Sequence, residues 1–178
     1  KELGASGKAL NTVTFAGDDS KVVKLGADVF ATNTIMNKST IELTKDVEIK
    51  GATATNATTI NLVDHALKLE NATINGSNTI KFNVSDKGDD LAGGNIVISG
   101  NLTYANGAAL VIDTKSGKVS RPTGGATREF TLIKNDGTLV GKGLDESMIT
   151  FSSHEKSLIT WTKSIDDKGR IKLIIEDN

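Results

Sequence analysis

The sequence predicts an all-β fold, a parallel β-solenoid with about 20 residues per coil and a C-terminal β-hairpin cap. The 178 residues include 21 Thr, 16 Ile and 11 Val, whose β-branched side chains favour strands over helices. Short apolar phrases recur at a spacing of about 20 residues, which is typical of repeat architectures. Apolar residues do not recur at the helical period among good helix formers, so we expect little helix.

The first strand of each coil carries a recurring phrase with isoleucine at its second position. The phrase reads TIEL at 40–43, TINL at 59–62, TIKF at 79–82 and, more loosely, NIVI at 95–98. Its isoleucines are spaced by 19, 20 and 16 residues. We expect Ile41, Ile60 and Ile80 to stack inside the solenoid, where burying each side chain is worth about 1.5–3 kcal/mol.

A second strand and a third extended piece follow in each coil. VEI at 47–49 precedes LKL at 67–69 by 20 residues, and ATA at 52–54 precedes ATI at 72–74 by the same distance. Stacked coils would place Glu48 over Lys68 on the outer face, an exposed ion pair worth about 0.2–1 kcal/mol. An antiparallel sandwich of immunoglobulin type is the rival fold, but it needs more hairpin turns than NG at 75–76 and 106–107 supply.

The pattern changes toward the C-terminus, after a Gly-rich break at 116–128. DDKG at 166–169 separates two alternating runs and predicts a hairpin turn, with Trp161 before it and Ile171 after it. The open end of a solenoid exposes unpaired backbone and apolar core, so it needs a cap of different construction. We therefore expect solenoid coils over 1–127 and a capping segment over 128–178.

Charge and cysteine content exclude several functions. Lys and Arg number 21 against 22 Asp and Glu, which argues against a nucleic-acid partner. Without cysteine the chain has no disulfide, thiolate metal site or cysteine nucleophile. No stretch approaches the 18 apolar residues of a membrane span. The first residues contain no initiator methionine and do not resemble a signal peptide, so we expect a segment of a longer polypeptide.

Asp64 and His65 are the first candidates for chemistry, since histidine occurs only twice. Neighbours in a strand point to opposite faces, so we interpret the pair as a polar corner. His154, in the charged run SSHEKS, is interpreted in the same way. Two isolated histidines without cysteine do not indicate a zinc site.

The remaining motifs are incomplete. GASGK at 4–8 and GDDS at 17–20 lack the pattern of a serine nucleophile, and SGK at 6–8 and 116–118 lacks the rest of a phosphate loop. SDKGDD at 85–90 and SIDDKG at 164–169 gather carboxylates in turns. An EF-hand counted from Asp86 would need glutamate where Val97 stands. Calcium in either loop stays an alternative, but we predict no catalytic, cofactor-binding or metal-binding residue.

Two runs in the C-terminal half stand out, ISGNLTYANGAALVID at 98–113 and REFTLIKNDGTLVGKGLDESMITF at 128–151. They resemble the C-terminal part of passenger domains of type V autotransporters from Gram-negative bacteria. The matching positions are Ala108 to Val111, Phe130 to Ile133, Gly137, Gly141 and Ile149 to Phe151. The Thr- and Asn-rich repeats before them are similar to large surface antigens of obligate intracellular bacteria such as rickettsiae.

The resemblance implies a right-handed parallel β-helix that is exported across the outer membrane to the cell surface by a C-terminal β-barrel translocator. It also implies that the C-terminal segment is an autochaperone, which agrees with the slow formation of non-local parallel pairs. We expect a non-enzymatic stalk and adhesin whose partner is a host cell-surface protein or glycan. The alternative is a carbohydrate-active β-helix enzyme, but such an enzyme uses paired carboxylates and often aromatic platforms, and the chain has one Trp and one Tyr.

Overall fold

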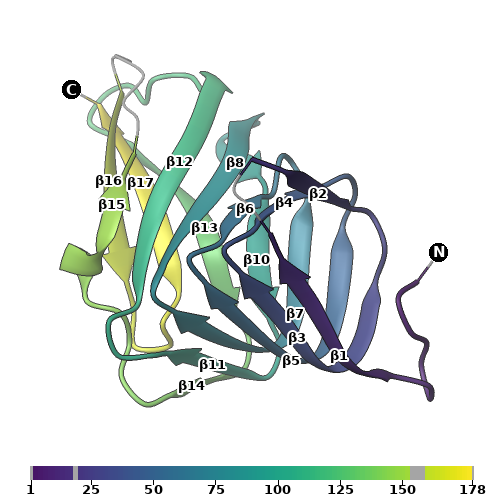
Figure 1. Ribbon diagram of the computed structural model, residues 1–178. Coiled ribbons are helices and arrows are strands. Elements are labelled where there is room, and N and C mark those ends of the chain that lie inside the picture. The colour runs from purple at the N-terminus through teal and green to yellow at the C-terminus, as the bar shows by residue number, and fades with distance from the viewer. Residues whose placement is uncertain (1, 18–19, 153–158, 178) are drawn as a thin grey trace.

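The computed structural model describes residues 2–17, 20–152 and 159–177, and this part of the chain is built almost wholly from strands (Figure 1). The one helical element among these residues is the 3-10 turn η1 (Glu146–Met148). The Asp145 side chain begins that turn by accepting a hydrogen bond from the backbone N–H of Ser147. The expected all-β fold with little helix is confirmed.

The strands form two sheets, and from β1 to β8 the chain alternates between them. The ten-stranded sheet contains β1 (Leu10–Ala16), β3 (Val29–Asn37), β5 (Val47–Asn56), β7 (Ala66–Asn75), β10 (Asn95–Ile98), β11 (Asn101–Tyr104), β13 (Thr127–Asn135), β14 (Thr138–Val140), β16 (Ile159–Ile165) and β17 (Ile171–Asp177). The seven-stranded sheet contains β2 (Val22–Leu25), β4 (Thr40–Leu43), β6 (Thr59–Asn61), β8 (Ser77–Lys87), β9 (Asp90–Gly93), β12 (Ala109–Lys118) and β15 (Ile149–Phe151).

Within each sheet, strands from successive repeats lie side by side and run parallel. The order β1-β3-β5-β7-β10-β13 in one sheet matches β2-β4-β6-β8-β12-β15 in the other. This arrangement is compatible with a β-solenoid, and it rules out the antiparallel sandwich. Figure 1 shows β1 at one end of the stack and the hairpin of β16 and β17 at the other.

The predicted aliphatic stack forms the centre of the core. Ile41, Ile60 and Ile80 are direct neighbours on β4, β6 and β8, and Ile112 on β12 continues the row. Each of these side chains is at most 2% exposed. At the N-terminal end the row finishes on Val23, which is 37% exposed because no described strand lies beyond β2. The expected stacking of the three isoleucines is confirmed.

The assignment of NIVI at 95–98 as a further copy of the TIKF phrase is wrong. These residues form β10 in the ten-stranded sheet, where Ile96 lies beside Leu67 of the LKL phrase. The neighbour of Ile80 in the next repeat is Ile112, which follows 32 residues later. The repeat is longer here because the short strand β9 folds back antiparallel on β8 before β10 begins.

The spacing of 20 residues holds for the first half of β5 and fails for its second half. Val47 lies beside Leu67 as expected, but Thr53 lies beside Ala72, only 19 residues on. The register changes between Ile49 and Ala52, where Gly51 has a φ of +84° and a Cβ atom would lie 2.0 Å from the carbonyl oxygen of Ala31. The expected alignment of ATA at 52–54 with ATI at 72–74 is therefore wrong by one residue, and Thr53 faces the core.

Polar side chains at the corners bind the backbone of the following repeat. The carboxylate of Asp28 accepts a hydrogen bond from the N–H of Glu48 at 2.9 Å, and Asp46 does the same for Ala66, again 20 residues on. Glu48 does lie over Lys68 on the outer face, as expected. Its carboxylate, however, forms an ion pair with Lys50 on the same strand, at 2.7 Å.

The hairpin predicted at 166–169 closes the C-terminal end. β16 and β17 pair antiparallel, and β17 lies antiparallel to β13. The turn is held to the stack by Tyr104, whose hydroxyl donates to the carbonyl of Gly169 at 2.8 Å, and by Asn135, whose amide donates to the carbonyl of Lys168 at 2.9 Å. β13, β14 and β15 still pair in parallel with the preceding repeat, so the division at residue 128 stays a prediction.

Candidate functional site

The outer face of the seven-stranded sheet carries a row of polar side chains, which we call the polar ladder: Lys24, Glu42, Asn61, Lys81 and Asp113. These residues are lateral neighbours on β2, β4, β6, β8 and β12. Each follows the residue of the aliphatic row by one position, and successive residues of a strand point to opposite faces. The alternation that builds the core therefore also aligns the ladder on the solvent side.

Members of the polar ladder satisfy one another across the strands. The amide of Asn61 donates to a carboxylate oxygen of Glu42 at 3.0 Å, and Lys24 approaches the other oxygen at 3.8 Å. Lys81 lies 3.6 Å from the carboxylate of Asp113. Such exposed pairs contribute roughly 0.2–1 kcal/mol each, so they stabilise the fold only slightly. They mainly fix the positions of hydrogen-bonding groups on a solvent-facing surface.

Two adjoining hollows lie on this face and share Lys81. One, of about 350 Å³, is lined by Glu42, Asn61, Lys81 and Asp113 of the polar ladder together with Val63, Phe82 and Asn83. The other, of about 550 Å³, is lined mainly by small polar and hydroxyl-bearing residues, which are Thr40, Thr58, Thr59, Ser77 and Thr79. Hydroxyls, amides and opposite charges can bind a polar chain through many weak contacts.

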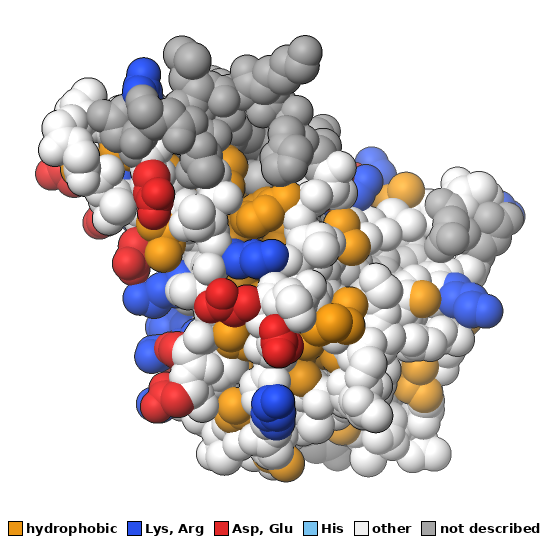
Figure 2. Space-filling view, turned by 90° about the vertical axis from the view of Figure 1, so that its left-hand side faces the viewer, with side chains coloured by type: hydrophobic (Ala, Val, Ile, Leu, Met, Phe, Trp, Pro, Cys, Tyr) orange, Lys and Arg blue, Asp and Glu red, His pale blue; other side chains and the backbone are white. Residues whose placement is uncertain are grey.

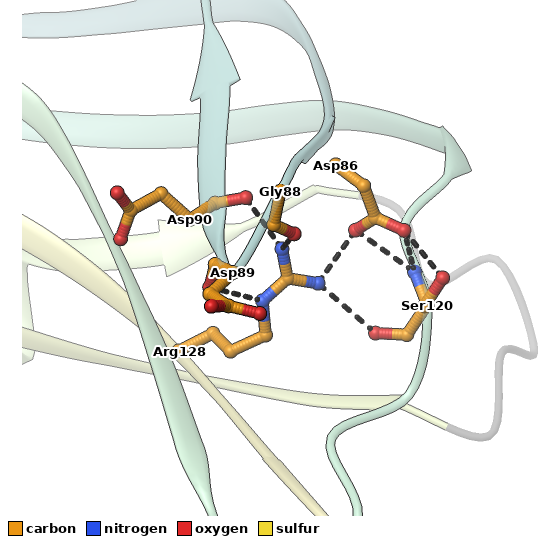
Figure 3. A network of polar contacts seen from close by, with 6 residues as sticks. All are labelled: Asp86, Gly88, Asp89, Asp90, Ser120 and Arg128. Atoms are coloured by element: carbon orange, nitrogen blue, oxygen red, sulfur yellow. Dashed lines mark hydrogen bonds and ion pairs between the residues drawn. The ribbon is translucent and has the colours of Figure 1, made fainter.

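The loop at 85–90, a candidate for calcium, is occupied by an arginine from another strand. Figure 3 shows the guanidinium of Arg128, at the start of β13, among the oxygen atoms of this loop. Its Nη1 forms an ion pair with the carboxylate of Asp86, and its Nε donates to the carbonyl of Asp89 at 3.1 Å. The Nη2 group donates to the carbonyls of Gly88 and Asp90. The Arg128 side chain is only 13% exposed.

This arrangement joins three segments that are distant in sequence. Nη1 of Arg128 also contacts the carbonyl of Ser120, in the segment that connects β12 to β13. The backbone N–H and the hydroxyl of Ser120 donate to Asp86. Hydrogen bonds from Ser120, and then the guanidinium of Arg128, lower the pKa of the Asp86 carboxyl below its usual value. The oxygens that a calcium ion would use are bound by a cation that the chain supplies itself.

The second acidic loop, at 164–169, is organised by hydrogen bonds within its own turn. The Asp166 carboxylate accepts hydrogen bonds from the backbone N–H groups of Lys168 and Arg170, both at 3.0 Å, and pairs with the Arg170 guanidinium. Partial burial opposes ionisation of Asp166, but these donors outweigh it, so its pKa is lowered. Among the described residues, no three His, Asp or Glu side chains are grouped as a metal site would require.

Asp64 and His65 do not act on each other. The Asp64 carboxylate accepts from the amide of Asn83 at 3.4 Å, whereas Nδ1 of His65 lies 3.7 Å from the Asp46 carboxylate. The backbone N–H of His65 donates to the carbonyl of Leu62, which closes the turn between β6 and β7. The two side chains thus have different partners at a corner. His154 lies outside the described residues.

The serine- and phosphate-type motifs lie only partly within the described residues. Residues 4–8 form an exposed turn in which Ala5 and Lys8 exchange backbone hydrogen bonds, at 3.3 and 2.9 Å. The GDDS run includes residues 18–19, which lie outside the described part of the chain, and nothing is described of the side chains of SGK at 116–118.

Arg128 was not singled out by the sequence analysis, although composition carries a signal for it. The chain has 3 Arg against 18 Lys. Arginine presents a planar array of donors that lysine cannot reproduce, so a rare arginine in a lysine-rich chain marks a site that needs several directed hydrogen bonds. The guanidinium groups of Arg128 and Arg170 each pair with a carboxylate of one of these two loops, in agreement with this reasoning.

Comparisons of the chain with models of protein families, with curated proteins and with solved structures find no match. In the described ranges, no helix has the length and apolar character that a membrane crossing requires.

Proposed function

We propose that the chain is a segment of a right-handed parallel β-helix from the passenger domain of a type V autotransporter. In this proposal it is exported across the bacterial outer membrane by its translocator barrel and stays at the cell surface, where it serves as a stalk and an adhesin. The support is the resemblance of residues 98–113 and 128–151 to such passengers, together with two parallel sheets built from successive repeats.

The observation that carries the adhesive role is the polar ladder with its two adjoining hollows on one face of the seven-stranded sheet. A surface of this kind offers donors and acceptors at the regular separation of adjacent strands, about 4.8 Å. A host glycan or a polar protein segment can follow it across several strands. Many weak contacts in register then give a binding strength that no single contact could.

A folding role for the C-terminal segment is the second part of the proposal. The hairpin of β16 and β17 closes between residues that are near in sequence, whereas the parallel pairs join residues about 20 apart. Local contacts form faster than non-local ones, so the hairpin is suited to form first and to template the preceding strands. Deleting 128–178 should lower the refolding yield much more than deleting an equal length at the N-terminus, and equal yields would exclude this role.

Adhesion is tested with beads that carry the protein and are incubated with host cells. Asn61→Ala combined with Lys81→Ala removes two central groups of the polar ladder and should reduce bead binding severalfold. The matched control is Lys68→Ala with Lys134→Ala, since these exposed lysines lie on the outer face of the ten-stranded sheet. Circular dichroism checks that both variants are folded. If the two variants bind cells equally well, the polar ladder is not the adhesive surface.

A further inference from the structure

Two Asn-Gly pairs lie at corresponding corners of the stack. Asn75 ends β7 and Gly76 follows it, whereas Asn106 and Gly107 form the turn between β11 and β12. Because β7 pairs with β11 and β8 pairs with β12, both dipeptides lie where the chain passes from the ten-stranded sheet to the seven-stranded sheet. The same dipeptide thus occurs in two surroundings that can be compared directly.

An Asn-Gly dipeptide is open to an intramolecular reaction. The backbone nitrogen of the glycine can attack the side-chain amide carbon of the asparagine, because glycine has no Cβ to obstruct the approach. A five-membered succinimide ring forms, and the side-chain nitrogen leaves as ammonia with the hydrogen of the glycine N–H. Water then opens the ring at either carbonyl and gives aspartate or isoaspartate. The two reacting atoms must meet, so the local structure decides the rate.

The pair at 75–76 is held by hydrogen bonds on both sides of the reacting peptide. The side-chain amide of Asn78, which is 1% exposed, donates to the carbonyl of Asn75 at 2.9 Å. The N–H of Ala109 donates to the carbonyl of Gly76, also at 2.9 Å. A Cβ atom on Gly76 would lie 2.4 Å from Oδ1 of Asn56, so little space is left beside it. Rotating the Asn75 peptide into position for attack would break these contacts.

The pair at 106–107 lacks these restraints. Asn106 and Gly107 are both exposed, and a Cβ atom on Gly107 would meet nothing within 4 Å. The turn is closed by the N–H of Ala108, which donates to the carbonyl of Ala105 at 3.0 Å. Within the described part of the chain, neither Asn106 nor Gly107 donates or accepts a hydrogen bond. The peptide between them can therefore rotate with little loss of native contacts.

We propose that Asn106 is a site of spontaneous modification, at which the folded protein converts its side-chain amide into the carboxylate of isoaspartate or aspartate. Asn75 keeps its amide in the folded state. The product carries one more negative charge than the unmodified chain. Where isoaspartate forms, the main chain runs through the former side-chain carboxyl carbon, so the turn between β11 and β12 is longer by one methylene group.

The new carboxylate belongs to the lining of a third hollow. This hollow, of about 460 Å³, is lined by the turn at 105–108 together with Lys142, Asp145 and Met148. Met148 is part of η1 and is 38% exposed. Figure 2 shows the side of the molecule on which η1 lies, where apolar patches are interrupted by charged side chains of both signs. Lys142 and Asp145 balance each other in charge, so the modification makes the lining of this hollow negative.

Incubation of the folded chain in mildly alkaline buffer tests the proposal, with a sample in urea as the unfolded reference. Ion-exchange chromatography measures the added charge, and peptide mapping with enzymatic methylation of isoaspartate locates it. In urea, both asparagines should react at comparable rates. In the folded chain, the rate at Asn106 should stay close to its rate in urea, whereas Asn75 should react about tenfold or more slowly than in urea.

Asn106→Gln is the blocking variant, because a glutamine side chain would have to close a less favourable six-membered ring. Asn75→Gln is its matched control, and circular dichroism checks that both variants are folded. The folded Asn106→Gln variant should lose almost all of the acidic product, whereas the control should form it like the unmodified chain. Protection of Asn106 as strong as that of Asn75, or undiminished acidic product in Asn106→Gln, would overturn the proposal.

Discussion

Removing the Arg128 side chain tests whether one guanidinium joins the β8–β9 turn to the start of β13. In Arg128→Ala, the carbonyls of Asp89 and Asp90 lose the donors that bind them at 3.1 and 2.5 Å. Hydrogen bonds of this kind contribute about 1 kcal/mol each, and the longer contacts to Gly88 and Ser120 contribute less. The free energy of unfolding should therefore fall by about 2–3 kcal/mol.

For a chain of this length, that loss lowers the melting temperature by about 4–12 °C. Arg128→Lys keeps the charge but supplies a compact ammonium with three donors in place of the planar guanidinium, so it should lose about half as much stability. Thermal unfolding followed by circular dichroism measures both effects. Hydrogen exchange should show faster opening of residues 86–93 and 119–127 than of β4 and β6.

Lys87→Ala is the matched control, because it removes an exposed cation from the same hairpin. If Arg128→Ala melts within a degree or so of that control, or if its exchange rates change evenly over the whole stack, the guanidinium does not join these segments.

Three further predictions concern the core, the hairpin turn and the response to acid. Ile60→Ala, in the middle of the aliphatic row, should lower the free energy of unfolding measured in urea by about 2–5 kcal/mol. Val23→Ala, at the exposed end of the row, should lower it by less than about 1 kcal/mol, and equal losses would contradict the burial argument. Tyr104→Phe removes the donor to the carbonyl of Gly169, so it should lower the free energy of unfolding by about 1 kcal/mol and speed hydrogen exchange at the Gly169 amide. An unchanged exchange rate would show that the Tyr104 hydroxyl does not hold the hairpin turn. Because the pKa of the Asp166 carboxyl is lowered in the folded state, its ionised form stabilises the fold above about pH 4, and this stabilisation is lost as the pH falls through the folded pKa. Asp166→Asn should therefore be less stable than the unmodified chain at pH 7, and its stability should depend less on acid. Melting curves recorded at several pH values would show both effects.

The aliphatic core could be predicted because the same buried position holds the same residue type in successive repeats. Ile41, Ile60 and Ile80 occupy equivalent places in successive strands, and a shift of one residue would turn them all to solvent. The hairpin turn at 166–169 was equally accessible, since its signal lies within a few residues. Local periodicity and local turn chemistry are the two kinds of information that a single sequence states directly.

The second half of β5 could not be placed correctly because threonine occupies its core positions. Thr53 is buried there, as is Thr34 beside it on β3, whereas most other threonines of the described residues are not buried. The pattern of polar and apolar residues therefore does not reveal the register change next to Gly51. Likewise, NIVI was misplaced because its composition fits either sheet, and only the inserted β9 explains the longer repeat.

The site around Arg128 was missed for a different reason. Its partners Asp86 and Ser120 are 42 and 8 residues away, and no short motif connects them. The carboxylates of the loop at 85–90 were considered as calcium ligands, because a sequence shows which residues are charged but not which side chains bind them. The polar ladder was accessible in part, since its members follow from the alternation that also predicts the core.

The parallel order of the strands has a mechanical consequence. Each strand pairs with strands about one repeat away in sequence, so tension on the two ends peels the stack from one end instead of shearing all strands at once. Releasing one repeat of 19 or 20 residues frees about 65–70 Å of extended chain. A molecule of this kind can lengthen stepwise under flow while the repeats that are still folded keep their shape.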